Sequence, residues 1–330
     1  MIMEKALIDI DKIVVGVVGI GLMGSSICTC MLIAGHPVIG LAPIPVDLEA
    51  VKLRICNDLD EARREGIITQ PTQYYLDHLL LTENYEDLAP CSLVVECTLE
   101  DLNIKSGVYQ KIEAVIAEDA ILTSNTSAIP ITLLQQSVKH PGRFFGLHWT
   151  IPAFTSRFLE VICGDHSEVS KGEYLCELAK YWSKEPTFVH KDIRGFIANR
   201  LMYAMYREAC HLVEEGYASV EDVDRACRNN TGYWMTLAGV FRWMDLTGVQ
   251  AYHAVMKDLL PDLHADPSIP TLIDDIVKSG GKGVANGHGF YTYTPEEARL
   301  WEETYKEFSF EIRKLALKYP EDVVKRKLKS

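Results

Sequence analysis

A glycine-rich stretch near the start of the chain has the spacing that binds the phosphates of a dinucleotide. Gly19, Gly21 and Gly24 form a G-x-G-x-x-G pattern, with Leu22 and Met23 between the last two glycines. The glycines permit a tight turn, close approach of a pyrophosphate and close packing of a helix on a strand. An apolar run precedes the pattern and a helical pattern follows it, as the fingerprint requires. These five residues are therefore predicted to contact a dinucleotide cofactor.

The segment after the second predicted strand lacks the acidic residue that usually binds the ribose hydroxyls of NAD. Ala42 stands at that position in the cofactor site, and residues 43–46 carry no charge. The 2′-phosphate of NADP would need a cationic partner, and the nearest downstream cations, Lys52 and Arg54, lie inside the following predicted helix. We therefore expect NAD as the cofactor, with NADP as the alternative.

Strand and helix patterns alternate over the first part of the chain and give way to helical patterns. Residues 14–18 form a continuous apolar run typical of a buried parallel strand. Strands that alternate with helices indicate a doubly wound sheet. From 196–215 onward the patterns are helical, apart from one short strand expected at 289–293. We predict an α/β Rossmann-type domain over residues 1–189, followed by an all-α domain over 190–330.

Composition narrows the compartment and the partners. The net charge of −13 argues against nucleic acid and anionic membrane surfaces as partners. The nine cysteines include no CxxC pair, which predicts free thiols in a reducing cytoplasm and neither a disulfide framework nor a metal site. Residues 1–13 do not have the pattern of a signal peptide, and no window reaches the roughly 18 apolar residues of a membrane span. We expect a cytoplasmic protein that binds a small molecule.

Five further segments occur in a characteristic order. They are TSNTSAIPIT (123–132), RFFGLHWTIPA (143–153), RFLEVI (157–162), DIRGFIANRL (192–201) and GHGFYTY (287–293). Together with the glycine-rich stretch, they resemble the 3-hydroxyacyl-CoA dehydrogenase family, including its carnitine dehydrogenase and gulonate dehydrogenase (lambda-crystallin) relatives. The resemblance implies interconversion of a 3-hydroxy and a 3-oxo group with a nicotinamide cofactor, a place in fatty acid metabolism, and a homodimer formed through the helical domain.

Four residues are candidates for the chemistry of such a reaction. Oxidation of a secondary alcohol requires a base for the hydroxyl proton. His148 is the candidate, because a histidine imidazole is the side chain most often used as a general base. The resemblance implies that Glu160, twelve residues later, orients this imidazole and stabilises its charged form. It also implies that Ser127 and Asn199 bind the substrate oxygen through a hydroxyl and an amide NH₂ group. Three further residues match positions near the nicotinamide and its ribose: Glu100, Lys105 and Asn125.

Each of the four catalytic candidates also has a structural interpretation. His148 could be a buried histidine with satisfied hydrogen bonds, and Glu160 could pair with Arg157 or face solvent. Ser127 and Asn199 could cap the helices that begin beside them. Because all four match the family in order and spacing, we favour the catalytic interpretation.

The chain departs from the family pattern where the substrate is expected to bind. Ile151 stands where the family usually has Asn before Pro152, and Arg157 follows shortly. An arginine could bind a free carboxylate bidentately, although a pair with a surface acid explains it equally well. The helix expected to meet CoA phosphates has mixed charge, with Arg63 and Arg64 as candidates. A free 3-hydroxy acid, or another 3-hydroxylated small molecule, is therefore the alternative to an acyl-CoA.

Two other interpretations compete with this one. The β-hydroxyacid dehydrogenase class shares the GxGLMG turn but is expected to use a lysine base, whereas Arg200 follows Asn199 here. A non-catalytic, crystallin-like NAD-binding protein would explain Ala42 and Ile151, but the complete set of four catalytic candidates argues against it. We therefore predict an NAD(P)-dependent oxidoreductase.

Overall fold

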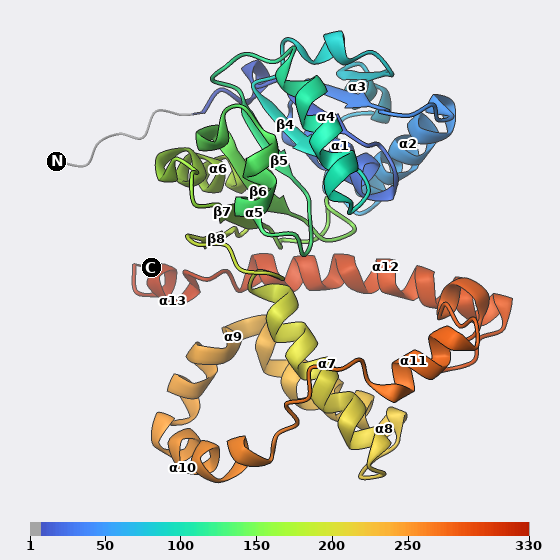
Figure 1. Cartoon of the computed structure of the whole chain (residues 1–330), viewed down its shortest axis with the longest axis vertical. Coiled ribbons are helices and arrows are strands. Elements are labelled where there is room, and N and C mark those ends of the chain that lie inside the picture. The colour runs from blue at the N-terminus through green and yellow to red at the C-terminus, as the bar shows by residue number, and fades with distance from the viewer. Residues whose placement is uncertain (1–7, 330) are drawn as a thin grey trace. The chain divides into compact units, whose positions relative to one another are not determined.

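The computed structural model describes residues 8–329. It divides into two compact units, and the boundary between them follows Asn199 (Figure 1). An eight-stranded sheet with helices forms the first unit, and helices form the second. The predicted Rossmann-type domain followed by an all-α domain is confirmed.

The sheet of the first unit has the strand order β3-β2-β1-β4-β5-β6-β7-β8. The strands are β1 (Val15–Val18), β2 (Val38–Leu41), β3 (Leu79–Thr82), β4 (Leu93–Glu96), β5 (Ile121–Ser124), β6 (Phe144–His148), β7 (Glu160–Cys163) and β8 (Thr187–Val189). Neighbouring strands are parallel except β6 and β7, which are antiparallel. The sequence patterns do not predict β3, a short edge strand in which Leu80 is exposed.

Helices cover both faces of this sheet. They are α1 (Leu22–Ala34), α2 (Leu48–Arg64), α3 (Thr72–Leu76), α4 (Leu102–Glu113), α5 (Ile131–Leu134) and α6 (Val169–Tyr181), with one-turn 3₁₀ helices at Ile10–Lys12, Tyr85–Leu88, Gln135–Ser137 and Pro141–Arg143. Residues of α4 and α5 share one buried cluster with one face of the sheet. On the other face, a side chain on Gly40 of β2 would meet Cys28 of α1. Alternation along β6 places Phe144, Gly146 and His148 on the face that α5 covers.

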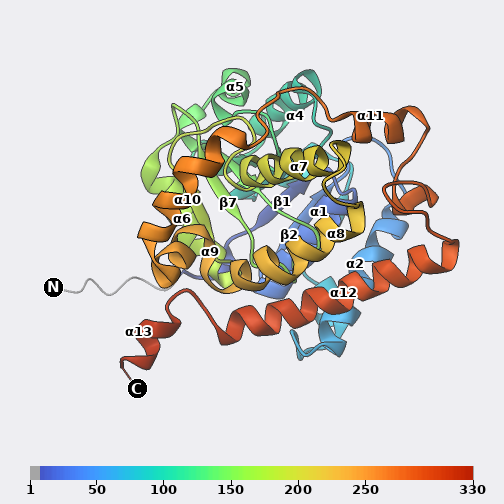
Figure 2. The ribbon, with the colours of Figure 1, turned by 90° about the horizontal axis from the view of Figure 1, so that it is seen from below.

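The first two helices of the chain, α1 and α2, both begin near the glycine-rich turn. Helix α1 follows the glycine-rich turn and ends at Gly35, whose φ of 99° suits a glycine at a helix terminus. Helix α2 begins after Asp47, whose side chain accepts a hydrogen bond from the backbone N–H of Ala50. The two helices lie side by side (Figure 2). Because each follows a parallel strand, both N-termini lie at the carboxyl edge of the sheet.

The second unit consists of helices joined by loops. They are α7 (Ala198–Glu214), which starts at the end of the first unit, α8 (Val220–Ala226), a π-helix (Cys227–Thr231), α9 (Gly232–Thr247), α10 (Val249–Leu259), α11 (Thr271–Lys278), α12 (Pro295–Lys318) and α13 (Val323–Lys327), with 3₁₀ turns at Leu260–Asp262 and Val284–Asn286. Gly239 interrupts α9 with a φ of 62°. The short strand expected at 289–293 is wrong: this segment forms only isolated bridges, because the backbone turns back at Gly287 and pairs locally.

Very little of the second unit is buried. Among its described residues, the buried apolar side chains are those of Cys210 and Phe310. On α12, Trp301, Tyr305 and Phe308 are each more than half exposed and follow one another at helical spacing. Across residues 8–329, the longest apolar helical windows fall short of what a membrane span requires.

Candidate active site

The glycine-rich turn leaves the start of α1 open to a ligand. Gly19 has a φ of 96°, and a Cβ on Gly24 would collide with the carbonyl oxygen of Gly19, so both positions require glycine. Gly21 precedes the helix without a side-chain cap, and a Cβ there would meet nothing within 4 Å. Leu22 is 67% exposed and Met23 is half-buried. Open backbone N–H groups at a helix N-terminus fit a dinucleotide pyrophosphate.

The loop after β2 contains neither a carboxylate nor a cation to meet a ribose. Ala42 is 2% exposed, and its N–H donates a hydrogen bond to the carbonyl of Thr82 at 2.9 Å. The uncharged residues 43–46 follow it, and the next acid, Asp47, caps α2. The loop is thus built by backbone pairing between β2 and β3, and its side chains offer no charge to a ligand.

His148 and Glu160 are brought together by the only antiparallel pair among the named strands of the sheet. They are directly opposite one another in the register of β6 and β7. Nδ1 of His148 lies 2.8 Å from Oε2 of Glu160. The imidazole is 10% exposed and the carboxylate 1% exposed. An acid twelve residues away in sequence therefore becomes the hydrogen-bond partner of a nearly buried histidine.

The second oxygen of Glu160 is held by the backbone at the start of α7. Oε1 accepts hydrogen bonds from the N–H groups of Ile197 at 3.0 Å and Ala198 at 2.9 Å. Phe196, immediately before them, has a φ of 49°, is fully buried, and packs its ring 5.7 Å from the His148 ring. A non-glycine residue in this left-handed conformation is strained and persists where its surroundings require it. Here the strain aims two backbone donors at Glu160.

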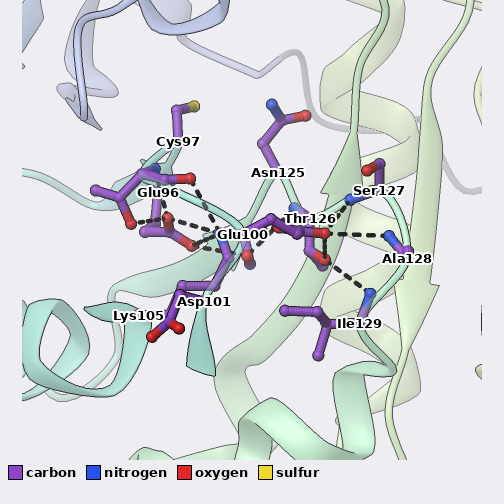
Figure 3. Close-up of polar contacts among 12 residues, drawn as sticks. Glu96, Cys97, Glu100, Asp101, Lys105, Asn125, Thr126, Ser127, Ala128 and Ile129 are labelled. Carbon is purple, nitrogen blue, oxygen red and sulfur yellow. Dashed lines mark hydrogen bonds and ion pairs between the residues drawn. The ribbon is translucent and has the colours of Figure 1, made fainter. Parts of the chain in front are cut away.

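Glu100 shapes the turn that carries Ser127. Oε1 of Glu100 accepts hydrogen bonds from the hydroxyl of Thr126 and from the backbone N–H groups of Ser127 and Ala128 (Figure 3). Burial raises the pKa of Glu100, but the Thr126 hydroxyl, Lys105 and the two backbone donors outweigh it, so the net pKa lies below its usual value. Glu100 is therefore a charged acceptor around which this turn is wrapped.

Ser127 and Asn199 are neighbours in the structure, although 72 positions separate them in the sequence. The Nδ2 atom of Asn199 donates a hydrogen bond to the backbone carbonyl of Ser127 at 2.7 Å. The Ser127 side chain is exposed, and its hydroxyl has no hydrogen-bond partner among residues 8–329. A hydroxyl donor and an amide thus lie together after the end of β5.

Glu96, at the end of β4, is the centre of a buried polar network. Its two carboxylate oxygens lie 2.9 and 3.0 Å from Nζ of Lys105, and they also accept hydrogen bonds from the hydroxyls of Tyr109 and Ser124. Burial and the Glu96 charge raise the pKa of Tyr109 well above its usual value, so its hydroxyl remains a donor. Nζ of Lys105, 1% exposed, also lies 3.5 Å from Glu100. Lys105 therefore joins two carboxylates and is not presented to solvent (Figure 3).

Asn125 links the ends of β5 and β6. Its Oδ1 accepts a hydrogen bond from the backbone N–H of Trp149, the residue after His148, at 3.0 Å. The loop that follows is tied to α1, because the hydroxyl of Ser26 accepts a hydrogen bond from the N–H of Ala153 at 2.8 Å. The position of His148 is thus coupled to the helix that begins at the glycine-rich turn.

An aromatic and basic cluster supports the other side of the same loop. The rings of Trp149 and Trp182 lie 5.5 Å apart, and Lys184 lies over the Trp149 ring and binds the carbonyls of Ala153 and Ser156. His36, fully buried, accepts a hydrogen bond from the indole N–H of Trp182 at 2.8 Å. These contacts hold the backbone of the loop between β6 and β7 in place.

The two substrate candidates lie in or beside this loop. Arg157 forms an ion pair with Glu185 at 3.2 Å. The side chain of Arg157 is thus engaged by an acid of its own unit. Ile151 is half-buried, and its peptide bond to Pro152 is cis. The side chain of Ile151 is apolar, so it offers a ligand an apolar contact where the family usually has an amide.

Three residues that build this site are not found by the sequence patterns. Glu96 ends a strand of apolar residues, Phe196 stands at the start of a pattern that predicts a helix, and Lys184 follows a helix. The charge of Glu96 inside the apolar run LVVE is the one available signal, since a buried acid requires a partner. Nothing local marks Phe196 or Lys184, because their partners are distant in sequence.

Family models match both units of the chain. The model described as "3-hydroxyacyl-CoA dehydrogenase, NAD binding domain" matches residues 14–193, and the C-terminal domain model of the same family matches residues 195–293. The chain belongs to the 3-hydroxyacyl-CoA dehydrogenase family. The resemblance seen in the ordered motifs is thereby confirmed.

Relatives within the 3-hydroxyacyl-CoA dehydrogenase family act on different molecules. The 5-formyl-3-hydroxy-2-methylpyridine 4-carboxylate 5-dehydrogenase of Mesorhizobium japonicum is 28% identical, with 86% of this chain and 92% of the relative covered. The 3-hydroxybutyryl-CoA dehydrogenase of Mycobacterium tuberculosis is 32% identical, with 84% and 98% covered.

Solved structures show the same division. The crystal structure of a 5-formyl-3-hydroxy-2-methylpyridine 4-carboxylic acid 5-dehydrogenase, described as an NAD⁺-dependent dismutase, has a TM-score of 0.85 at 26% identity and covers 92% of this chain and 97% of its own. The (S)-3-hydroxybutyryl-CoA dehydrogenase of Ralstonia eutropha has a TM-score of 0.70 at 27% identity and covers 85% and 99%. NAD is the cofactor of the N-terminal domain, and the open start of α1 fits its pyrophosphate.

Proposed function

We propose that the protein interconverts a 3-hydroxy group and a 3-oxo group of a small molecule, with His148 as the base. The observation that carries this proposal is the 2.8 Å hydrogen bond between His148 and Glu160. It lies at the carboxyl edge of the parallel strands, where open α/β sheets bind ligands. Bound NAD supplies the two-electron acceptor for the substrate carbon.

The hydrogen bonds of the pair define the direction of proton transfer. A carboxylate only accepts hydrogen bonds, so we assign the proton of neutral His148 to Nδ1, which donates to Glu160. Nε2 then has a free lone pair that takes the proton of the substrate hydroxyl. Glu160 accepts three hydrogen bonds in all, two of them from backbone N–H groups, and its negative charge stabilises the imidazolium that forms.

Ser127 and Asn199 provide the donors for the substrate oxygen in this proposal. The free hydroxyl of Ser127 donates to it, and the amide of Asn199 has one N–H left after its bond to the Ser127 carbonyl. Asn199 also fixes the turn from which the Ser127 hydroxyl projects. Two donors would then stabilise negative charge on the oxygen as its proton leaves.

The predicted cofactor residues divide in this proposal into those that contact NAD and those that position its neighbours. The backbone of the turn at residues 19–24 binds the pyrophosphate, and Ala42 lies beside the adenosine ribose. Glu100 holds the turn at Ser127 in place, and this turn would lie beside the nicotinamide. Lys105 and Asn125 are positioning residues, because Lys105 is enclosed by carboxylates and Asn125 is bonded to the Trp149 backbone.

A second candidate substrate class is a carboxylated small molecule without CoA. The relative with the TM-score of 0.85 acts on a pyridine carboxylate, and the net charge of −13 does not attract the polyanionic CoA. Arg157 does not support this class, since Glu185 already neutralises it. The acyl-CoA class is supported by the family itself and by the 3-hydroxybutyryl-CoA dehydrogenases among its relatives.

The experiment that tests the proposed function measures NADH formation with two substrate panels. One panel contains 3-hydroxyacyl-CoA thioesters of increasing chain length, and the other contains the matching free 3-hydroxy acids and hydroxylated aromatic carboxylates. Activity with any 3-hydroxy substrate that His148→Gln abolishes supports the proposal. Equal turnover by the His148→Gln variant would refute it. The better panel decides between the two substrate classes.

We also propose that a second copy of the chain covers the helical unit. A domain of this size ordinarily buries about two-thirds of its surface, whereas Cys210 and Phe310 are the buried apolar side chains among its described residues. The stripe on α12 through Trp301, Tyr305 and Phe308 exposes aromatic side chains of the kind that homodimer interfaces bury. This matches the homodimer that the sequence resemblance implies.

The cysteines support a reducing compartment. All nine are free thiols. Burial raises the pKa of Cys28 and of Cys91 to about 12, so both remain protonated and unreactive at neutral pH. We therefore retain the cytoplasm as the proposed location.

A further inference from the structure

Arg54 is the cation that the structure brings to the start of α1. Its Nη1 atom donates a hydrogen bond to the hydroxyl of Ser25 at 3.2 Å, across 29 positions of sequence. Ser25 is fully buried in the first turns of α1, and its hydroxyl lies 2.8 Å from the carbonyl of Gly21. A chain of hydrogen bonds therefore leads from the guanidinium to the residue that precedes the open helix terminus.

The geometry of the two helices explains how Arg54 reaches this place. Helices α1 and α2 lie side by side, and both begin at the carboxyl edge of the sheet (Figure 2). Side chains on a helix lean toward its N-terminus, so an arginine in the second turn of α2 extends back toward that edge. The sequence alone places Arg54 inside a helix and gives no reason to connect it with the glycine-rich turn.

The charge of Arg54 meets no opposite charge in the described part of the chain. Residues 8–329 provide no carboxylate that forms an ion pair with it. Asp58, one turn further along α2, is bonded by the hydroxyl of Thr29 instead. A guanidinium has five N–H donors in a planar fork that matches phosphate oxygens, and only one is used here, on Ser25.

We propose that Arg54 binds a phosphate group of the dinucleotide, so that part of the cofactor's anchorage has moved from the ribose to a phosphate. The proposal rests on the NAD site of the family and accounts for Ala42. A site without the ribose acid loses charged hydrogen bonds, and a half-buried guanidinium beside the helix terminus replaces them with contacts of comparable strength. Lys52 does not serve this purpose, because its side chain is exposed on α2.

Two phosphates of the cofactor share this chemistry, and binding data distinguish them. The pyrophosphate is common to NAD and NADP, whereas the 2′-phosphate belongs to NADP alone. Dissociation constants for NADH and NADPH are measured by calorimetry on the full-length protein, without substrate. Competition by ADP-ribose and by adenosine shows whether the effect depends on phosphate.

The decisive variant is Arg54→Met, which keeps the length of the side chain and removes its charge. We expect Arg54→Met to weaken NADH binding about 10- to 100-fold, the range for a charged hydrogen bond. An equal factor for NADPH assigns the contact to the pyrophosphate, and a larger factor for NADPH assigns it to the 2′-phosphate. ADP-ribose should weaken in parallel with NADH, while adenosine should not change.

Three companion variants separate charge from structure. Lys52→Met removes a charge from the same helix and should change NADH binding less than twofold. Arg54→Lys keeps the positive charge and should bind NADH more tightly than Arg54→Met. This comparison separates the loss of charge from any loss of stability that Arg54→Met causes. Ser25→Ala keeps the guanidinium and should lose less affinity than Arg54→Met.

The proposal is wrong if Arg54→Met binds both NADH and NADPH as the wild type does, or if adenosine weakens by the same factor as ADP-ribose. It is also wrong if Lys52→Met has the same effect, since net charge alone would then explain the loss. These measurements need no turnover, so a failure of the His148 mechanism leaves them interpretable, and a failure here leaves that mechanism standing.

Discussion

Oε2 of Glu160 lies 2.8 Å from Nδ1 of His148, and the two residues face one another across β6 and β7. The antiparallel direction of β7 makes this possible, because β7 begins at the carboxyl edge of the sheet, where β6 ends. The same carboxylate is held by two backbone N–H groups before α7. Its orientation is thus determined by the fold on both sides.

Replacing Glu160 by glutamine should lower kcat strongly. The amide keeps the size of the side chain but removes the charge that stabilises the imidazolium, and general base catalysis is worth about 10²- to 10⁴-fold. The measurement is steady-state turnover of the substrate found in the panels. NADH affinity should stay within about twofold of the wild type, because Glu160 does not reach the cofactor turn. A variant with full kcat would contradict the proposed role.

Replacing Ser127 by alanine should lower kcat/KM by about 10- to 100-fold, the value of one lost hydrogen bond to a charged oxygen. The turn itself should survive, because Glu100 binds its backbone and not the Ser127 hydroxyl. Ser92→Ala, at the opposite edge of the sheet, is the matched control and should leave kcat/KM unchanged. Equal values for the two variants would remove Ser127 from the site.

The parts of this site that depend on local sequence could be predicted from the sequence alone. The glycine-rich turn is local, since the strand before it and the helix after it are its immediate neighbours. His148 and Glu160 sit on apolar runs that predict strands, and the family resemblance implies that they pair.

What escapes the sequence is contact between distant elements. The resemblance places Lys105 near the nicotinamide ribose, and nothing in the sequence indicates that Glu96 and Glu100 enclose it. Arg54 appears as one more charge on a mixed helix, but its partner Ser25 lies on another helix. No periodicity relates such pairs, because only the packing of α1, α2 and α4 on the sheet brings them together.

His36 should make the first unit less stable in acid. Burial lowers the pKa of His36, and both ring nitrogens are used: Nδ1 contacts the carbonyl of Ile13 and Nε2 accepts from Trp182. The unfolded chain, with a histidine pKa of about 6.5, takes up the proton first as pH falls. The stability from His36 is therefore complete above that pH and declines below it, until pH passes the folded value.

The measurement is the free energy of unfolding of the wild type and of His36→Gln at pH 7 and pH 5. Their difference should narrow toward pH 5, by at most about 1.4 kcal/mol per pH unit. Groups that titrate in both proteins cancel in the difference. A gap that is constant or widens in acid would mean that His36 is protonated in the folded protein.

The apolar stripe on α12 should control assembly. Phe308 is 58% exposed in the chain, so Phe308→Ser removes surface that a second copy would bury. We expect a shift from dimer to monomer in sedimentation equilibrium, together with a lower melting temperature. Glu307→Ser, the adjacent exposed position, is the control and should remain dimeric. A wild-type protein that sediments as a monomer at all concentrations would contradict the proposed dimer.

Replacing Ala42 by aspartate should strengthen NAD binding, because the carboxylate would accept hydrogen bonds from the ribose hydroxyls. Ala42 is 2% exposed, so the new charge is poorly solvated in the free protein and should lower its melting temperature. Calorimetry with NADH measures the gain, and Ala42→Asn controls for size without charge. An unchanged dissociation constant for Ala42→Asp would place the ribose elsewhere.

The indoles of Trp149 and Trp182, tilted by 31° with their centroids 5.5 Å apart, give the first unit a fluorescence signal. Trp149 follows His148 directly and donates its backbone N–H to Oδ1 of Asn125, while the indole N–H of Trp182 donates to His36. A molecule that binds beside His148 is therefore expected to change the emission of Trp149. Substrate binding can then be followed by the tryptophan fluorescence of the unlabelled protein. Replacing each of the two tryptophans in turn identifies which indole gives the change.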